Sequence, residues 1–530
     1  MAGLPALWSG GFVDPALERD QDPPQAWLDA VDDLDARADG HRVLQVPGAE
    51  FGAFRWGYTV DQPIPGLSDT PLVTRDLLPL GSPAAMNLLF ALDDRLQQGA
   101  LDPDAVAPVA RLFGANTVWL ANDLAYDRFR TPRPDAVADA FDAGARGLAP
   151  PRPFGEPSVN AADVPMVDEE WIRRGGEPPA LAPVWHLDVD EPVPVVRAKQ
   201  HEAVLVGDGA GVVDAAAAGL LHPDHLVRYA SMLDDHELAT VVDDAEIVVV
   251  TDTDRPRARH WRSSQDTLGF TEDGTDRPAV LRPADGDARL VYATREGTGH
   301  RTVAVQEGPV TARASAYGEP LAYRPEDRAV MALDASTATA WRVADRADAV
   351  GEHLELDLGA PTDHVVLRQP DTSPGARRIT AVTIAVDDGP GRQVDLDDRS
   401  LTDPGQRIDL ATIDGGADIV AGSTVLIEIA ATDASPDHPD ARAAVGFATV
   451  DAGLGPTTEV VHVPTVGLDA TGADTPLAIV LTRERVRPTD RWRNDPEPVL
   501  RRELTLPHDR RLRPAITVRL DRRAGDAVLA

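Results

Sequence analysis

The period of the hydrophobic residues changes near residue 300, and this change limits the possible folds more than any other feature of the chain. Residues 181–300 alternate strand-like and helical apolar runs, which is typical of βαβ units and a parallel sheet. Residues 301–455 carry short runs in which apolar and polar residues alternate, separated by turn residues. That pattern predicts an antiparallel β-sandwich.

The two ends of the chain complete the expected organisation. Helical spacing of the leucines between residues 88 and 96, and a strand candidate at 117–120, predict a mixed α/β region. The stretch 148–157 holds four prolines and is typical of a linker. Strand-like runs at 477–482 and 515–520 indicate the start of a further β-domain. We therefore expect four regions, at 1–155, 156–300, 301–455 and 456–530.

The composition excludes several classes of function. The chain has 530 residues, with 87 acidic against 51 basic residues and a formal net charge of −36. A surface so acidic repels phosphates, so we expect no nucleic-acid partner. Because the chain has no cysteine, disulfides, thiol nucleophiles and cysteine-ligated metals are excluded. No apolar run approaches the roughly 18–20 residues of a membrane span, and the N-terminus lacks the features of a secretory signal.

A glycine-rich turn is the first candidate site. Gly207, Gly209 and Gly211 lie between an apolar strand and a helix, where a dinucleotide site would bring its backbone close to a pyrophosphate. Asp234 lies after the next possible strand and could bind a ribose. The spacing is not the full fingerprint, and a tight turn without a ligand is the favoured alternative.

Histidines and aspartates offer two further candidates. His222, His225 and His236 lie near one another, but Pro223 interrupts them, so a surface loop is favoured over a zinc site. Carboxylates at 252 and 254 follow the apolar strand at 246–250. They could line a ligand crevice or cap a helix, and capping is the favoured interpretation.

The segment 332–341 combines a polar loop with a tryptophan. Asp334 and Thr339 could supply oxygen ligands to Ca²⁺, and Trp341 would then fill the core of the sandwich. The alternative is a polar turn that packs the tryptophan and binds no ion.

A second aromatic segment suggests carbohydrate binding. Trp56 and Tyr58 lie between Arg55 and Asp61, and sugars stack on aromatic rings while polar neighbours bind their hydroxyl groups. The alternative is that these aromatic residues belong to a core, as most tryptophans do.

Several stretches together resemble a known family. They lie at 42–73, 81–134, 207–221, 249–272 and 323–343, in the family's order. They are similar to the extracytoplasmic region of the actinobacterial α-(1→3)-arabinofuranosyltransferases, which are membrane glycosyltransferases of the GT-C type. The stretch 493–511 resembles the start of that family's next β-domain.

The resemblance implies a function. The family transfers arabinofuranose from a decaprenyl-phosphate donor to the arabinan of arabinogalactan and lipoarabinomannan, and its extracytoplasmic part carries discoidin-like carbohydrate-binding sandwiches. Residues 310–452 would be such a jelly-roll module, with Asp334 and Thr339 on its loop. The family's usual Gly and Asp on this loop are Ala335 and Ser336 here, which weakens the expectation of calcium.

We therefore expect the soluble portion of an arabinofuranosyltransferase-like protein on the extracytoplasmic side of the plasma membrane. Its partners would be an arabinan acceptor and a membrane-embedded GT-C portion, and the chain alone would not catalyse transfer. Two alternatives remain open: a stand-alone carbohydrate-binding protein of the cell envelope, and a nucleotide-dependent enzyme that uses the loop 207–211.

Overall fold

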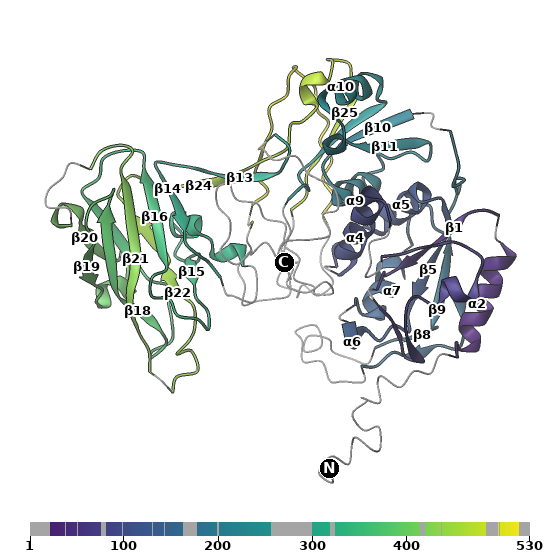
Figure 1. Cartoon of the computed structure of the whole chain (residues 1–530), viewed down its shortest axis with the longest axis horizontal. Coiled ribbons are helices and arrows are strands. Elements are labelled where there is room, and N and C mark those ends of the chain that lie inside the picture. Colours follow the sequence, from purple (N-terminus) through teal and green to yellow (C-terminus); the bar gives the residue numbers. More distant parts are fainter. Residues whose placement is uncertain are drawn as a thin grey trace, which may run out of the picture.

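The computed structural model describes most of the chain between residues 22 and 518. Its internal gaps are 38, 50, 76–80, 98, 130, 143, 163–177, 199–200, 256–298, 319–323, 414–418, 436, 484–496 and 498. The described residues form a mixed α/β body and a β-sandwich, with several separate sheets (Figure 1). Over the same residues, no helix has both the length and the apolar character required to cross a membrane.

The first sheet has the strand order β4-β1-β5-β9-β6. Its strands are β4 (Leu72–Val73), β1 (Arg42–Val46), β5 (Ala115–Ala121), β9 (Val184–Asp188) and β6 (Arg152–Phe154). The first three are parallel, whereas β9 and β6 run antiparallel to their neighbours, so this sheet is mixed. Strand β9 is thus antiparallel although it lies in the region 181–300, where we expected a parallel sheet.

The expected linker at 148–157 supplies the edge strand β6 of this sheet. Pro153 has no N–H to donate, and an edge strand tolerates that loss because one of its sides has no partner. Strand β9, which lies after the boundary expected at residue 155, pairs with β5 and completes the sheet.

The second sheet is parallel throughout, with the order β11-β10-β12-β25. Its strands are β11 (His225–Tyr229), β10 (His201–Val206), β12 (Ile247–Thr251) and β25 (Leu477–Val480). The run at 477–482 therefore adds an edge strand to an α/β sheet, where we expected it to begin a separate β-domain. An apolar strand pairs readily with an open sheet edge, whatever its distance along the chain.

The two sheets share a layer of helices. Helices α4 (Pro83–Gln97), α5 (Val106–Leu112) and α9 (Gly209–Ala217) form one apolar core with buried residues of both sheets. A partly buried ion pair, Arg95 Nη2 to Asp214 Oδ2 at 2.7 Å, joins α4 to α9. The outer faces are covered by α2 (Gln25–Ala36) on the first sheet and α10 (Asp235–Asp244) on the second.

The sandwich packs two groups of antiparallel strands around a separate core. One sheet contains β14 (Val310–Ala314), β16 (His353–Leu358), β21 (Thr424–Asp433), β18 (Arg378–Val386) and β19 (Arg392–Asp395). The facing strands are β20 (Gln406–Asp409), β17 (His364–Arg368), β23 (Thr449–Asp451), β15 (Trp341–Val343) and β22 (Val445–Phe447). Burial alternates along β16, as the period-two pattern predicted.

A small third sheet joins the sandwich to the α/β body. It contains β13 (Val303–Glu307), which precedes the sandwich, β24 (Thr458–His462), which follows it, and β26 (Arg502–Glu503). Figure 1 shows β13 and β24 between the two parts of the molecule. The described residues 515–518 form no strand, although we expected one at 515–520.

Candidate functional site

A β-hairpin lies where the parallel strands of the first sheet end. It consists of β2 (Gly52–Phe54) and β3 (Gly57–Val60) and is held by the segment that follows β5. The Arg55 N–H donates to the Asp123 carbonyl at 2.8 Å, and the Ala125 N–H donates to the Ala53 carbonyl at 2.9 Å. Ligands of α/β sheets bind outside the carboxyl ends of parallel strands, so the hairpin occupies a position typical of a binding site.

Aromatic rings gather beside this hairpin. The ring centroid of Phe129, in the short helix α6 (Tyr126–Phe129), lies 4.9 Å from that of Phe51 and 5.9 Å from that of Tyr58. The Arg128 guanidinium lies 5.2 Å over the Tyr58 ring, a cation–π contact. All four side chains are partly exposed. We call Phe51, Tyr58, Arg128 and Phe129 the hairpin patch.

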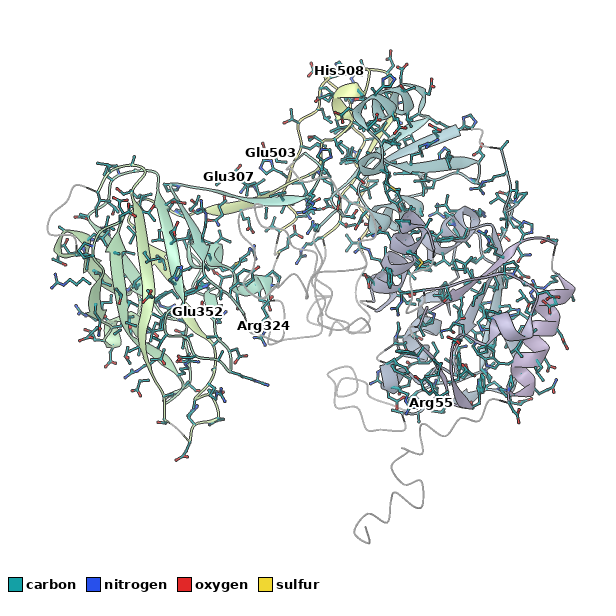
Figure 2. The ribbon with its side chains drawn as sticks, in the orientation of Figure 1. Arg55, Glu307, Arg324, Glu352, Glu503 and His508 are labelled. Carbon is teal, nitrogen blue, oxygen red and sulfur yellow. The ribbon has the colours of Figure 1, made fainter. Side chains whose placement is uncertain are left out.

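Arg55 supports the hairpin from behind. Its Nη2 donates to Asp127 Oδ1 at 2.7 Å, its Nε donates to Asn160 Oδ1 at 2.5 Å, and its guanidinium lies 5.2 Å over the Tyr126 ring. Figure 2 labels this side chain at the edge of the α/β body. Because its guanidinium group already has these partners, Arg55 positions the hairpin and is poorly placed to contact a ligand directly.

The other predicted carbohydrate-binding residues are spread over different surroundings. Trp56 stacks on Phe54 at 5.2 Å and meets Trp27 edge-on at 5.6 Å, so it borders the core under the sheet. Asp61 is exposed just after β3. Only Tyr58 of the four predicted residues is part of the hairpin patch. The sequence did not indicate the other three members of the patch, Phe51, Arg128 and Phe129. Their grouping depends on contacts between segments about 70 residues apart in the chain.

A buried carboxyl group lies next to the hairpin. Asp123 follows β5, and its Oδ2 accepts a hydrogen bond from Trp27 Nε1 at 2.8 Å. Burial raises the pKa of Asp123 to about 7, although the Trp27 hydrogen bond acts in the opposite direction. This group therefore keeps its proton over most of the acidic range and helps to hold the hairpin against α2.

The backbone N–H groups of the glycine-rich turn donate to acceptors within the protein. The Asp208 carboxylate caps α9 by accepting from the N–H groups of Ala210 and Gly211 at 3.0 and 3.3 Å. The Gly209 N–H donates to Asn87 Oδ1 of α4 at 2.5 Å, and a β-carbon at Gly209 would lie 2.6 Å from the Asn87 carbonyl oxygen. These N–H groups already have acceptors, which favours a tight turn packed against α4 over a pyrophosphate site.

The remaining candidates of the α/β body have structural contacts. Asp234 forms a capping box with Glu237 at the start of α10, a role that competes with ribose binding. The His225 Nδ1 accepts from the His222 N–H at 3.2 Å, while His236 lies in the first turn of α10. In the described part of the chain, these histidines do not form a group that could hold one ion.

Asp252 is an ion-pair partner in the described structure. It is fully buried, and its Oδ1 accepts from the Thr482 N–H at 3.0 Å. Its Oδ2 accepts from Arg502 Nε at 2.5 Å and lies 3.4 Å from Arg255 Nη2. The residues that would follow as a capped helix, from 256 on, lie outside the described residues.

The loop at 332–341 brings its two predicted oxygen ligands together. The Thr339 hydroxyl lies 2.9 and 2.8 Å from the two Asp334 carboxylate oxygens, and the Ser336 N–H donates to Asp334 Oδ1 at 2.9 Å. These hydrogen bonds close the loop with a single carboxylate, whereas Ca²⁺ takes about 6–8 oxygen ligands. Calcium binding at this pair stays a prediction. Trp341 is fully buried, as predicted for a core residue, and its Nε1 donates to the Ala316 carbonyl at 2.9 Å.

Comparison with known proteins shows the family to which this chain belongs. A family model described as the N-terminal GT-C domain of α-(1→3)-arabinofuranosyltransferase matches residues 11–284, just over half of the chain. This chain belongs to that family.

Individual relatives agree with the family match. The α-(1→3)-arabinofuranosyltransferase of Mycolicibacterium smegmatis is 27% identical over 536 residues, covering 94% of this chain and 35% of the relative. The Mycobacterium tuberculosis enzyme of the same name is 27% identical over 413 residues, covering 72% of this chain and 27% of the relative. The chain thus spans about a third or less of the length of these relatives.

The fold is also shared with a solved structure. The cryo-EM structure of the mycobacterial arabinofuranosyltransferase AftD aligns with a TM-score of 0.62 and 20% identity, over 87% of this chain and 34% of that one. Its R1389S mutant, class 2, aligns with a TM-score of 0.64 and 21% identity, over 87% and 35%.

Proposed function

We propose that this chain is part of an enzyme of cell-wall arabinan synthesis and that its hairpin patch holds the polysaccharide acceptor. The observation that carries the proposal is the grouping of three partly exposed rings, Phe51, Tyr58 and Phe129, beside the Arg128 guanidinium. Sugar rings stack their C–H faces on aromatic side chains, and a guanidinium supplies several N–H donors for hydroxyl groups. The patch lies at the carboxyl end of the parallel strands, where such folds commonly bind ligands.

The transfer of arabinofuranose to the acceptor would take place outside the hairpin patch. We assign it to a membrane-embedded GT-C portion on the extracytoplasmic side of the plasma membrane, which would use a decaprenyl-phosphate arabinose donor. Holding the growing polymer beside that portion raises the local concentration of acceptor ends and favours repeated transfer. The β-sandwich at 310–452, built as two antiparallel layers around Trp341, would be a discoidin-like second carbohydrate-binding module.

Calorimetric titration of the chain with arabinofuranose oligosaccharides tests this role. We expect Tyr58→Ala and Phe129→Ala each to weaken binding by about tenfold, or ~1.4 kcal/mol, because each removes a stacking ring. Tyr58→Phe keeps the ring and its contact with Arg128, so it should bind as the parent does. Equal affinity of all four proteins would show that the hairpin patch does not hold the glycan.

Arginines provide a second matched pair for the same titration. Arg128→Gln removes a guanidinium from the hairpin patch, whereas Arg146→Gln removes one from another part of the α/β body, where the Arg146 side chain is 68% exposed. We expect only the first change to weaken binding. Equal losses would indicate a general effect of charge and would count against a specific site.

A further inference from the structure

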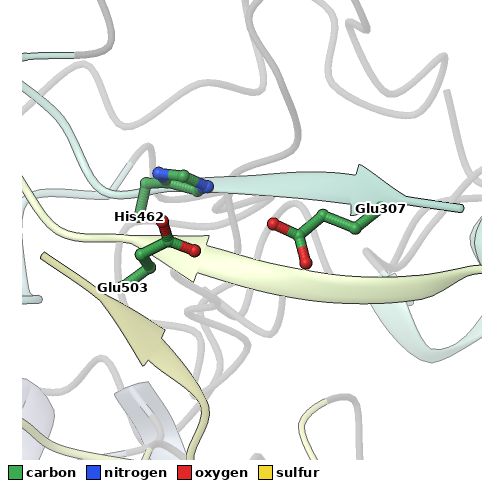
Figure 3. A group of neighbouring side chains, drawn as sticks. All are labelled: Glu307, His462 and Glu503. Atoms are coloured by element: carbon green, nitrogen blue, oxygen red, sulfur yellow. The ribbon is translucent and has the colours of Figure 1, made fainter.

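Three side chains of the small third sheet, β13-β24-β26, bring one imidazole and two carboxylates close together. Glu307 ends β13, His462 ends β24 and Glu503 ends β26. Each can offer one ligand atom, and these atoms lie within 4.8 Å of one another. Among the residues that the structure describes, this is the only set of three or more His and acidic side chains close enough to hold one ion. Figure 3 shows the Glu307 carboxylate pointing toward the other two.

The strand register explains how residues so distant in sequence meet. In the parallel pair, His462 lies directly opposite Glu503, so the two side chains leave the same face of the sheet. In the antiparallel pair, His462 lies opposite Val303, at the far end of β13 from Glu307. The long Glu307 side chain reaches back along the strand toward the imidazole (Figure 3). Three separate parts of the chain therefore supply the group.

These three side chains have few polar partners among the described residues, so they are available to bind an ion. Over the described residues, the His462 ring and the Glu503 carboxylate have no hydrogen bond or ion pair with another side chain. Glu307 has one partner, Arg501, whose Nη2 lies 3.4 Å from Glu307 Oε2. Arg501 is 52% exposed and also donates to Thr458 Oγ1 at 3.2 Å, so its hold on Glu307 is weak. Two nearby carboxylates repel each other, which favours a cation between them.

We propose that Glu307, His462 and Glu503 bind one divalent transition-metal cation, with Zn²⁺ as the best match. Zinc takes imidazole nitrogen and carboxylate oxygen at about 2.0–2.2 Å in tetrahedral geometry, which places neighbouring ligand atoms about 3.4 Å apart. The ligand atoms lie up to 4.8 Å apart here, so side-chain rotation has to shorten the largest separation by about 1.4 Å to reach that spacing. Water would take the fourth position. Ca²⁺ and Mg²⁺ prefer oxygen ligands throughout, so the imidazole selects against them.

The position of the site gives it a mechanical role. Strand β13 leads into the sandwich and β24 leads out of it, while β26 belongs to the C-terminal segment. One ion bound to all three strands fixes the connection between the sandwich and the α/β body. Figure 2 labels Glu307 and Glu503 in this connection. The cation would thereby hold the sandwich in one orientation.

Calorimetric titration of the metal-free chain with ZnCl₂ tests the proposal. A large excess of Mg²⁺ is present, because a net charge of −36 attracts cations diffusely. We expect one equivalent of zinc to bind, with the affinity falling at least about tenfold in His462→Ala and in Glu503→Gln. Arg501→Gln removes the competitor for Glu307 and should strengthen binding. His438→Ala is the matched control, since His438 lies 3.9 Å from a carboxylate, Asp440, on the sandwich.

Two results would overturn the proposal. The first is the absence of saturable zinc binding. The second is weak binding that the parent and the His462 and Glu503 variants share equally, which would mean adventitious ions only. Thermal unfolding without metal shows whether each variant folds. If His462→Ala does not fold, Glu503→Gln decides, because it keeps the shape of the side chain and removes its charge.

Discussion

At the scale of single residues, Trp56 and Trp341 have different surroundings. Trp341 is fully buried and stacks on Phe447 with ring centroids 6.1 Å apart. Trp56 is partly exposed at the border of its core, against Phe54 and Trp27. The polar loop before Trp341 predicted its buried position, because loop and tryptophan are adjacent in sequence. The position of Trp56 depends on Trp27, which lies in a helix that the sequence analysis did not predict.

We expect Trp341→Ala to lower the free energy of unfolding of the sandwich by about 3–5 kcal/mol, the usual cost of removing a fully buried tryptophan. Trp56→Ala should cost less than half as much, because solvent already reaches part of its ring. Urea unfolding followed by circular dichroism measures both changes. Equal costs for the two variants would contradict the burial described for them.

Asp123 makes stability depend on pH in a defined direction. Its ordinary pKa is 3.8, and burial raises the pKa to about 7 in the folded chain. Between these values the unfolded chain loses the proton that the folded chain keeps, so the stability of the fold decreases as the pH rises from about 4 to about 7. Asp123→Asn cannot ionise and still accepts a hydrogen bond from Trp27 through its amide oxygen.

The stability of Asp123→Asn relative to the parent should therefore increase over that pH window and become constant above it. Urea unfolding of both proteins at a series of pH values gives this difference. Other titrating groups, such as Asp327, whose pKa burial also raises to about 7, are present in both proteins and cancel. A difference that does not vary with pH would contradict the raised pKa.

At the scale of elements, helices α4 and α9 approach closely at Gly209. A β-carbon there would lie 2.5 Å from Asn87 Oδ1 and 2.6 Å from the Asn87 carbonyl oxygen, too close for either helix to remain in place. The glycines of this turn thus permit close packing between helices. The sequence predicted the strand, the turn and the helix correctly, but it could not show what covers the turn, because α4 lies more than 100 residues earlier.

Gly209→Ala should destabilise the α/β body by about 1–3 kcal/mol, the usual effect of forcing an extra group into a packed interior. Gly66→Ala is the control, since nothing lies within 4 Å of a β-carbon at Gly66. Differential scanning calorimetry of both variants is the measurement. A loss in Gly66→Ala as large as that in Gly209→Ala would point to backbone flexibility as the cause.

At the scale of the whole molecule, segments that are distant in sequence complete earlier sheets. The sandwich strands, from β14 to β23, all lie after the change of period near residue 300, because strand and helix periods are local properties. The pairing of β25 with β12 and of β6 with β9 could not be predicted, because strand partners are chosen by tertiary packing. The candidate site was predicted only at Tyr58 for the same reason.

Arg502 secures the C-terminal segment to the second sheet. Its side chain is 3% exposed and pairs with the buried Asp252 carboxylate, and it also contacts Glu497. Arg502→Gln removes the nearer of the two guanidinium groups beside the buried Asp252 carboxylate and leaves only Arg255 at 3.4 Å. Removing one partner of a buried pair usually costs about 3–5 kcal/mol, and the remaining Arg255 places the expected cost at the lower end of this range. The neighbouring variant Arg501→Gln changes a 52% exposed side chain and should cost little. Unfolding in guanidinium chloride compares the stabilities of the two variants, and similar midpoints would contradict the role of the buried pair.

The proposed function depends on the hairpin patch holding an arabinofuranose polymer. Hydroxyl-radical footprinting of the chain with and without bound arabinan locates the contact directly, because side chains covered by the glycan react more slowly. We expect protection of Phe51, Tyr58 and Phe129, whether or not side chains of the sandwich are protected as well. Protection confined to the sandwich, or no protection at saturating arabinan, would show that the hairpin patch does not hold the polymer.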